Sequence, residues 1–538
     1  MMKEWENIGN SLGTPSGANP RLEGMRKILN LSYKNLPFHL RTCLMYLAKY
    51  PEDYFIQRDD VIKQWIAEGF VRSSPGQDLE DTGNSYFNEL INRGLIKPEQ
   101  KNYFPRVTGC RVHDMMLDLI LSKCQEDNFI TVDYNCEDYI SMATQHGYNC
   151  NKVRRLSLQF KAAKSACRML TEGREIPDHL AQVRSVSLFG KHASGLPLLL
   201  QFKYLRVLHI MWNDGSDRAD LTSLSQLLHL RYLMFVGRSC KVELPSRICG
   251  LVNLETLEIE CSSIVSVPLD IVSLPSLYHL MLQPKWPLNR LPIIKSLRTL
   301  DISPSMGMDI KALGELTNLR ELKLYFAKKM MLTVGSLGTL WSSIGKLQNL
   351  RYLRIIGISG IADEDLLDSL WSFPRSLEIV ILRDCGFPRV PRWINSLSNL
   401  TLLYMFVSET CTDEVGVLGE LPSLISLKLY VYGQIKGTIM FGASGGSFPA
   451  LEFLFLSCDG DASAQLGFKE GVLPKLERLQ LMLYNCLLPP IGMEHLLSLQ
   501  LIELEGKSKT YPWDAAECAL RNAAQAHPNR PALKFHRV

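Results

Sequence analysis

The chain has 538 residues, of which 46% are hydrophobic and 21% are charged, and these proportions exclude a largely disordered or collagenous protein. Its 59 basic and 55 acidic residues leave a net charge of only +4, too little for the basic footprint of a dedicated nucleic-acid-binding protein. No apolar run approaches the roughly 20 residues that span a bilayer, and the amino-terminal residues lack the apolar core of a signal peptide. We therefore expect an intracellular protein with no transmembrane segment and no nucleic-acid partner.

The first module, over residues 21–123, is predicted to consist of helices followed by a β wing. Asp59 can cap the start of one helix and Gly69 can end it, and Gly94 ends the next. Apolar residues at helical spacing predict helices over Met25–Leu29, Leu40–Ala48, Asp59–Glu68 and Tyr86–Asn92. Short strands are then expected over Leu95–Lys97, Asn102–Phe104 and Arg111–His113. This order predicts a winged-helix domain, with residues 124–150 as a linker behind it.

A repeat of the form L-x-x-L-x-L occupies residues 151–506 at a period of roughly 20 to 31 residues. One such unit cannot bury its apolar face alone, so the units must stack into a leucine-rich-repeat solenoid, and we expect their leucines to form its core. The copies begin at Val153, Val183, Leu205, Leu230, Leu254, Leu277, Leu297, Leu319, Leu350, Leu377, Leu400, Leu424, Leu451, Leu476 and Leu499. The predicted fold class is α/β, a winged-helix domain followed by a curved parallel β-sheet with a helical or irregular convex side.

Between the strands, apolar spacing changes from two to three or four, which predicts helical turns on the convex side. Leu244–Leu251 and Val390–Leu397 show this pattern most clearly. Within residues 507–538, the Ala-rich stretch Trp513–Ala526 is predicted to form a helix that caps the last repeat, with a tail after it.

Partner binding in a solenoid is expected on the concave sheet, at the residues that alternate with the buried leucines. In the first half these positions are mixed, but aromatic residues accumulate from Leu319 onward. Tyr and Arg are enriched where protein partners bind, whereas a solvated sheet face needs no stacked rings. Two interpretations remain open, a protein-recognition patch and packing of the rings on a neighbouring domain or on each other. The candidate residues are Tyr325, Tyr352, Arg354, Tyr404, Phe406, Tyr430, Phe453 and Phe455.

Four segments of the first module carry a family resemblance. They are Leu31–Pro37, Tyr46–Tyr54, Trp65–Phe70 and Arg111–Asp118, the last with Val112 in the place of a methionine. Together they resemble the winged-helix subdomain and the Met-His-Asp motif of plant nucleotide-binding leucine-rich-repeat disease-resistance proteins of the coiled-coil type. The repeats fit the sensor region of that family, so the resemblance covers nearly the whole chain.

The pair His113 and Asp114 precedes an apolar-periodic run, so Asp114 can cap a helix whose amino terminus accommodates phosphate. A structural cap alone is the simpler interpretation. The resemblance implies a nucleotide-sensing role for the pair, in which His113 contacts the β-phosphate of bound ADP in the resting state. Full-length relatives would hold ADP or ATP in this way.

The chain departs from the family pattern because no G-x-x-x-x-G-K-[ST] phosphate loop occurs in its sequence. We therefore expect no cofactor in this chain and no ATP hydrolysis. Residues 1–20 are interpreted as a remnant of the nucleotide-binding segment or a linker, and the chain as the carboxy-terminal part of a receptor. Isolated histidines without paired nucleophiles or carboxylates also argue against an enzyme.

The resemblance implies a plant immune receptor or receptor fragment, cytoplasmic or peripheral to the plasma membrane. Its repeats would recognise a pathogen effector or a guarded host protein, and its winged helix would couple to an ADP/ATP switch, here through a nucleotide-binding partner in trans. The alternative is an intracellular leucine-rich-repeat adaptor, such as a ubiquitin-ligase substrate receptor, which needs no nucleotide switch.

Overall fold

The computed structural model describes residues 20–73, 75–100, 103–133, 153–159, 182–190, 202–212, 218–265, 267–285, 293–304, 309–326, 333–358, 372–410, 412–433, 438–443, 445–458, 465–483, 488–506 and 513–537. The expected amino-terminal segment 1–20 lies outside these residues except for Pro20, and so do residues 134–150 of the expected linker and residues 151–152 of the expected solenoid.

The first module forms a winged helix around a compact apolar core. Trp65 and Phe87 are fully buried in that core, and their ring centroids lie 6.4 Å apart. The elements are α2 (Pro20–Lys34), α3 (Phe38–Tyr46), η1 (Leu47–Lys49), β1 (Ile56–Gln57), α4 (Arg58–Glu68), α5 (Leu79–Asn92), β2 (Lys97–Glu99), β3 (Gly109–Arg111) and α6 (Asp114–Glu126). The three strands form an antiparallel sheet in the order β1-β3-β2.

Two predictions for α4 and the wing were wrong, and β2 and β3 lie two residues away from the strands predicted over Leu95–Lys97 and Arg111–His113. Asp59 does not cap α4, because the helix begins one residue earlier and Gln57 holds the N-cap position. Tyr103 and Phe104 are not in a strand but in the loop between β2 and β3, which is the wing. The prediction for Gly69 is confirmed, since it ends α4 with a left-handed φ of 81°.

Each of the fifteen predicted repeats contains a strand of one parallel sheet. The leucines stack in register, so that Leu280 pairs with Leu257 on one side and with Leu300 on the other, all fully buried. The strands are β5 (Arg155–Gln159), β6 (Ser185–Gly190), β7 (Val207–Trp212), β9 (Tyr232–Glu243), β10 (Thr256–Ile264), β11 (His279–Lys285), β12 (Thr299–Ser303), β13 (Glu321–Tyr325), β14 (Tyr352–Ile356), β15 (Ile379–Phe387), β16 (Leu402–Val407), β17 (Ser426–Val431), β19 (Phe453–Cys458), β21 (Arg478–Leu483) and β23 (Leu501–Gly506).

The sheet also has strands that the repeat pattern did not predict. β4 (Thr131–Asp133) pairs with β5 inside the expected linker, and β24 (Ala532–Arg537) pairs with β23 inside the expected tail. β8 (Arg218–Asp220) pairs with the second half of β9. A separate parallel sheet joins β18 (Thr438–Phe441), β20 (Gln465–Phe468) and β22 (Leu488–Ile491).

The convex side carries short helical elements, as predicted, but not in every repeat. Leu244–Leu251 forms no helix, because the carboxylate of Asp270 accepts from the backbone N–H groups of Ile248 and Cys249 and so holds the segment as a turn. The cap helix α13 (Trp513–Ala526) has the predicted bounds. The other elements are η3 (Thr222–Gln226), η4 (Leu269–Ser273), η5 (Ile310–Glu315), α10 (Val334–Gly345), η6 (Arg392–Ser396), α12 (Thr412–Leu418) and η7 (Met493–His495).

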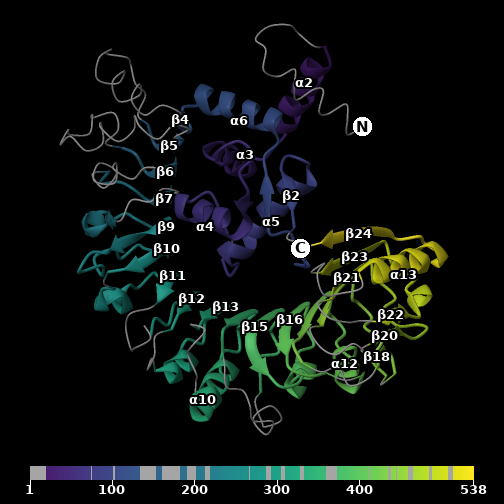
Figure 1. Cartoon of the computed structure of the whole chain (residues 1–538). Coiled ribbons are helices and arrows are strands. Elements are labelled where there is room, and N and C mark those ends of the chain that lie inside the picture. Colours follow the sequence, from purple (N-terminus) through teal and green to yellow (C-terminus); the bar gives the residue numbers. More distant parts are fainter. Residues whose placement is uncertain are drawn as a thin grey trace.

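The parallel sheet curves in an arc, and the winged helix sits inside that arc against its amino-terminal strands (Figure 1). Helix α4 contacts β7 and β9. The concave face of the solenoid is therefore covered by the first module over its amino-terminal half.

Candidate functional site at the domain interface

Eight of the concave positions of the first repeats, expected to be exposed, are buried under the winged helix, whereas Glu260 is half-buried. Each of the eight is at most 8% exposed, although none of them belongs to the leucine core. They are His209, Tyr232, Met234, Thr256, Glu258, His279, Thr299 and Asp301. The expectation of an open concave face was wrong here, because a second domain rather than solvent lies on it.

Lys49 stands out in this interface, because it is a lysine and yet it is only 2% exposed. Its Nζ lies 4.5 Å from the ring centroid of Tyr46 and 4.8 Å from that of Tyr50, and it donates to Oε1 of Gln64. Burial lowers the pKa of Lys49 to about 7, although nearby Glu68 opposes that shift. The lysine therefore changes charge near neutral pH.

The same region is tied to the first strands of the solenoid by hydrogen bonds. The backbone oxygen of Lys49 accepts from Ser157 Oγ at 2.6 Å and from Gln159 Nε2 at 3.1 Å. Gln64 Nε2 donates to the hydroxyl of Tyr232 at 3.4 Å. On α4, Glu68 forms an ion pair of 3.0 Å with Arg155 of β5. These bonds pair several buried polar groups of the two domains across the interface, although both ring nitrogens of the buried His209 have no hydrogen-bond partner among the described residues.

The amino terminus of α5 makes a second set of contacts, which we name the α5 latch. It consists of Asp78 and Glu80 on the winged helix and His279, Arg298 and Arg320 on the solenoid. Arg298 Nη1 lies 2.8 Å from Glu80 Oε1 and 3.0 Å from Asp78 Oδ2, and Arg320 Nη2 lies 2.6 Å from Asp78 Oδ2. His279 Nε2 lies 3.4 Å from Glu80 Oε1. Two carboxylates therefore meet two guanidinium groups across the interface.

The protonation states of the α5 latch follow from burial and these bonds. Burial alone raises the pKa of Glu80, but the hydrogen bonds from His279 and Arg298 outweigh it and hold that pKa well below its usual range. Burial lowers the pKa of His279, so its imidazole donates to Glu80 as a neutral group at pH 7. The guanidinium groups therefore supply the positive charge that keeps Glu80 ionised.

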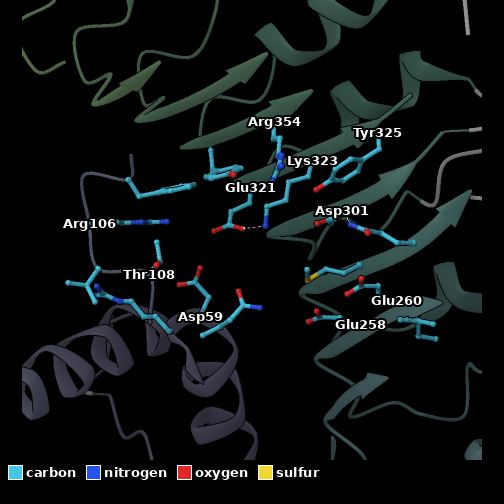
Figure 2. A pocket seen from close by; sticks show the side chains of 18 of the residues that line it. Asp59, Arg106, Thr108, Glu258, Glu260, Asp301, Glu321, Lys323, Tyr325 and Arg354 are labelled. Atoms are coloured by element: carbon cyan, nitrogen blue, oxygen red, sulfur yellow. Dashed lines mark hydrogen bonds and ion pairs between the residues drawn. The ribbon is translucent and has the colours of Figure 1, made fainter. Parts of the chain in front are cut away.

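Between the wing and strands β10 to β14 lies a cavity of about 340 Å³, which we name the wing cavity (Figure 2). Asp59 and Arg106 line it from the winged helix, and Glu258, Lys323 and Arg354 line it from the sheet (Figure 2). Lys323 Nζ lies 3.2 Å from Glu321 Oε2. Within the described residues, no cluster of three or more histidine, cysteine or carboxylate side chains could hold a metal ion.

Two residues that line the wing cavity each have a buried polar atom with no hydrogen-bond partner within the described part of the chain. These atoms are Oε2 of Glu258, a residue only 8% exposed, and Nε of Arg354. Burial raises the pKa of Glu258 to about 8, and the nearby carboxylate of Asp60 adds to the shift. Asp301, by contrast, accepts from Gln283 Nε2 at 3.0 Å.

The aromatic residues predicted for partner binding fall into two groups. Tyr325, Tyr352 and Arg354 line the wing cavity, where Tyr352 packs in one cluster with Tyr103 and Phe104 of the wing. The guanidinium carbon of Arg354 lies 5.6 Å from the ring centroid of Tyr325. Tyr352 of this group therefore packs on a neighbouring domain, which is one of the two interpretations given above. A role of the group in partner binding stays a prediction.

The second group forms a stack along β16, β17 and β19, which we name the aromatic ladder. Its members are Tyr404, Phe406, Tyr430, Tyr432 and Phe455. Phe406 and Tyr430 stack with centroids 4.3 Å apart and an interplanar angle of 9°, and Tyr430 lies 4.7 Å from Phe455. Phe406 and Phe455 are buried, Tyr404 and Tyr430 are half-buried, and Tyr432, which the sequence analysis did not select, is 54% exposed.

Two cations accompany the aromatic ladder. Lys428 Nζ lies 4.5 Å from the ring centroid of Phe455 and 4.3 Å from that of Tyr103 in the wing. Burial lowers the pKa of Lys428 to about 8. The remaining predicted residue, Phe453, is buried with the guanidinium of Arg478 5.2 Å from its ring. The aromatic ladder is therefore next to the wing, and Lys428 contacts both.

His113 lies apart from these groups, at the start of α6. It, and not Asp114, is the N-cap: its Nδ1 accepts from the backbone N–H of Met115 at 3.4 Å, and Asp114 is the first residue of the helix. The prediction that Asp114 caps was therefore wrong by one residue. The exposed imidazole and the helix start fit a phosphate group, but among the described residues they do not by themselves form a nucleotide site.

The sequence analysis did not select the polar residues of α4 that lie at the interface. Asp60, Lys63 and Gln64 fall on one face of α4 by their three- and four-residue spacing, a polar stripe beside apolar neighbours. That stripe could have indicated a polar partner surface. The surface that this polar stripe contacts depends on how the two domains dock, and no local sequence pattern specifies the docking.

Comparisons with known proteins agree with this architecture. The family described as "Leucine-rich repeat region" matches residues 182–533, and the one described as "Disease resistance protein Winged helix domain" matches residues 50–120. The rice (Oryza sativa subsp. japonica) "Disease resistance protein RGA5" is 34% identical, with 97% of this chain and 47% of that protein covered. The tomato (Solanum lycopersicum) "ToMV resistance protein Tm-2(2)" is 28% identical, with 86% and 54% covered.

Among solved structures, the "Plant peptide hormone receptor RGFR1 in complex with RGF2" aligns with a TM-score of 0.44 and 16% identity over 72% of this chain and 60% of that one. The chain spans about half the length of the curated relatives named above. No helix in the described ranges is both long and apolar enough to cross a membrane. The relatives favour the immune interpretation over the ubiquitin-ligase adaptor. With a leucine-rich-repeat region over most of its length and a disease-resistance winged helix before it, the chain belongs to the plant disease-resistance proteins.

Proposed function

We propose that this chain is the recognition part of a plant immune receptor, in which the solenoid binds a pathogen effector or a guarded host protein. The observation that carries the proposal is the division of the concave face. Its amino-terminal strands are covered by the winged helix, whereas the aromatic ladder reaches solvent at Tyr404, Tyr430 and Tyr432. Exposed, pre-stacked tyrosines offer contact area at a low cost in side-chain entropy, which suits a protein partner.

The ladder lies next to the wing, and this position suggests how binding is sensed. Lys428 lies against both Phe455 of the ladder and Tyr103 of the wing. A partner that displaces the lysine from these rings would weaken the contact between the two domains. Recognition would then act on the docking of the winged helix by a shift in population between docked and undocked states.

The nucleotide part of the proposal rests on the family alone. We infer that His113 and Asp114 sense an ADP or ATP phosphate in the longer relatives, with the imidazole as the donor. A nucleotide-binding partner in trans could complete such a site for this chain. We assign the chain itself no catalytic role, because the proposed activity is binding.

The recognition proposal is tested by a screen of the chain against secreted pathogen proteins with a split-luciferase readout. Partners found with the wild-type chain are measured again with Tyr404→Ala, Tyr430→Ala and Tyr432→Ala combined. We expect at least a tenfold loss of affinity, because such anchors carry about 2 kcal/mol or more each. Tyr204→Ala is the matched control, since Tyr204 is 53% exposed and lies outside the ladder. Equal binding by the triple variant would refute the ladder as the recognition surface.

A further inference from the structure

We propose that the wing cavity binds a small organic cation, whose ammonium or guanidinium group pairs with Glu258 and whose oxygen acceptor receives a hydrogen bond from Arg354. This site is separate from the aromatic ladder and does not depend on the recognition proposal. It would hold its ligand between the winged helix and the solenoid, because both domains line the cavity (Figure 2).

The carboxyl group of Glu258 has an oxygen without a hydrogen-bond partner among the described residues. Glu258 is 8% exposed, lines the wing cavity and has no partner for Oε2. A buried carboxylate oxygen without a donor is unfavourable, so such groups are normally paired. A ligand cation in the cavity would supply the missing donor.

Two of the cations around the cavity are already paired with protein groups. Lys323 pairs with Glu321, and Arg58 donates to Asn84 Oδ1 at 2.7 Å. Arg106 acts on Glu321, where its charge lowers the pKa of that carboxyl. An anionic ligand would have to compete with Glu321 for Lys323. A cationic ligand meets Glu258 Oε2, to which no side chain in the described ranges donates a hydrogen bond, because Lys63 and Lys323 act on Glu258 through their charge alone.

The positions of the two unpartnered atoms determine the length and polarity of the ligand. Glu258, Met281, Asp301, Lys323 and Arg354 lie in one register row across β10 to β14. The two unpartnered atoms therefore belong to opposite ends of the row, with the cavity between them. A ligand with a cation at one end and a carbonyl or hydroxyl oxygen at the other would satisfy both atoms.

The test is isothermal titration of the full chain with three compounds of similar length. 6-Aminohexanamide carries a cation and a carbonyl oxygen, hexanamide lacks the cation, and adipamate has a carboxylate in its place. We expect 6-aminohexanamide to bind at least about tenfold more tightly than the other two, because only it forms the charge-assisted bond to Glu258. Tighter binding of adipamate, equal binding of all three, or no binding at millimolar concentration would each overturn the proposal.

Two variants on the same strand assign the site. Glu258→Gln should weaken binding of 6-aminohexanamide about tenfold or more. Glu260→Gln should bind as the wild type does, because the carboxylate of Glu260 is already paired with Arg238 at 2.8 Å. Equal affinity of the Glu258 variant and the wild type would refute the assignment. If that variant does not fold, the affinities of the three compounds for the wild type still test the proposal.

Proton release gives an independent readout at pH 7. With a pKa raised by burial to about 8, Glu258 is mostly protonated in the empty cavity, and pairing with a cation would release that proton. The titratable groups that interact with its charge are Asp60 and Lys63 of α4, Asp301 and Lys323 of the sheet, and the hydroxyls of Tyr54 and Tyr232, and Glu258→Gln leaves these groups in place. The titration heat should therefore depend on the ionisation enthalpy of the buffer in the wild type and not in this variant. Equal dependence in both would contradict the role of Glu258.

Discussion

The α5 latch makes the strongest quantitative prediction, for the substitution Glu80→Gln. This change keeps the shape of the side chain and removes its charge. Glu80 accepts from Arg298 at 2.8 Å and faces His279 at 3.4 Å, and its side chain is 23% exposed. Because hydrogen bonds to charged groups contribute about 1.5–3 kcal/mol, we expect docking of the winged helix to weaken by about 2 kcal/mol. That corresponds to roughly a thirtyfold larger undocked population.

The assay is the rate at which hydrogen peroxide oxidises Met234. This methionine lies on the concave face and is 5% exposed in the docked state, so its oxidation reports undocking. Glu89→Gln is the matched control on the same helix, because the one ion pair that Glu89 makes in the described part of the chain is with Arg93, at 2.8 Å on the exposed helix surface. That pair is expected to contribute less than about 0.5 kcal/mol.

The contribution of the α5 latch to docking should also depend on pH, in a direction set by the pKa of Glu80. The pKa of Glu80 in the docked protein lies below its usual value of 4.5, so the undocked state binds the proton more readily. The latch therefore stabilises docking fully above about pH 4.5 and loses that contribution as the pH falls further. Met234 oxidation should accelerate on acidification in the wild type and much less in Glu80→Gln. Equal oxidation rates for the wild type and the variant at pH 7 would refute this account of the latch.

Three further predictions concern the interface and the repeat core. Lys49→Met should make the melting temperature rise less, or fall more, between pH 7 and pH 10.5 than it does in the wild type, because the unfolded lysine holds its proton up to about 10.5 and the folded one only to about 7; an equal pH dependence in the two proteins would contradict this role of Lys49. Leu353→Ala should cost about 2–5 kcal/mol in urea unfolding, since Leu353 is fully buried in the leucine core, and a cost below about 1 kcal/mol would contradict that packing. Gly357→Ala should cost about 1–3 kcal/mol by the same method, because Gly357 has a φ of 83° and an added Cβ would lie 2.4 Å from the Phe326 oxygen; Gly386→Ala, which has open space at that point, should be nearly neutral.

The repeat architecture could be predicted because its information is local. Each L-x-x-L-x-L unit specifies a strand, and stacking of identical units sets the register, as in the Leu257, Leu280 and Leu300 row. The end strands β4 and β24 were missed because they lack that pattern. Thr131–Asp133 holds one apolar residue, and Ala532–Arg537 alternates apolar and basic residues. Strand identity at the ends comes from pairing with a neighbour, not from the segment itself.

The domain interface could not be predicted, because it is a property of two surfaces brought together. The concave residues Glu258 and Asp301 looked like solvated polar positions, and Lys49 and Gln64 looked like surface residues of a helical module. Their burial follows only from docking. The aromatic residues were recognised as unusual, but burial under the wing separates Tyr352 from the half-exposed Tyr404.

The central claim is that the winged helix covers the amino-terminal half of the concave sheet. Hydroxyl-radical footprinting of the full chain tests it most directly, because it reports the solvent access of individual side chains. Tyr232, Met234 and Tyr352 point from the concave face and are at most 7% exposed. The account predicts that they react as slowly as the core residue Met405, while Tyr204 and Tyr432, which are 53% and 54% exposed, react rapidly. Rapid modification of Tyr232, Met234 and Tyr352 in a folded chain would contradict the docked arrangement.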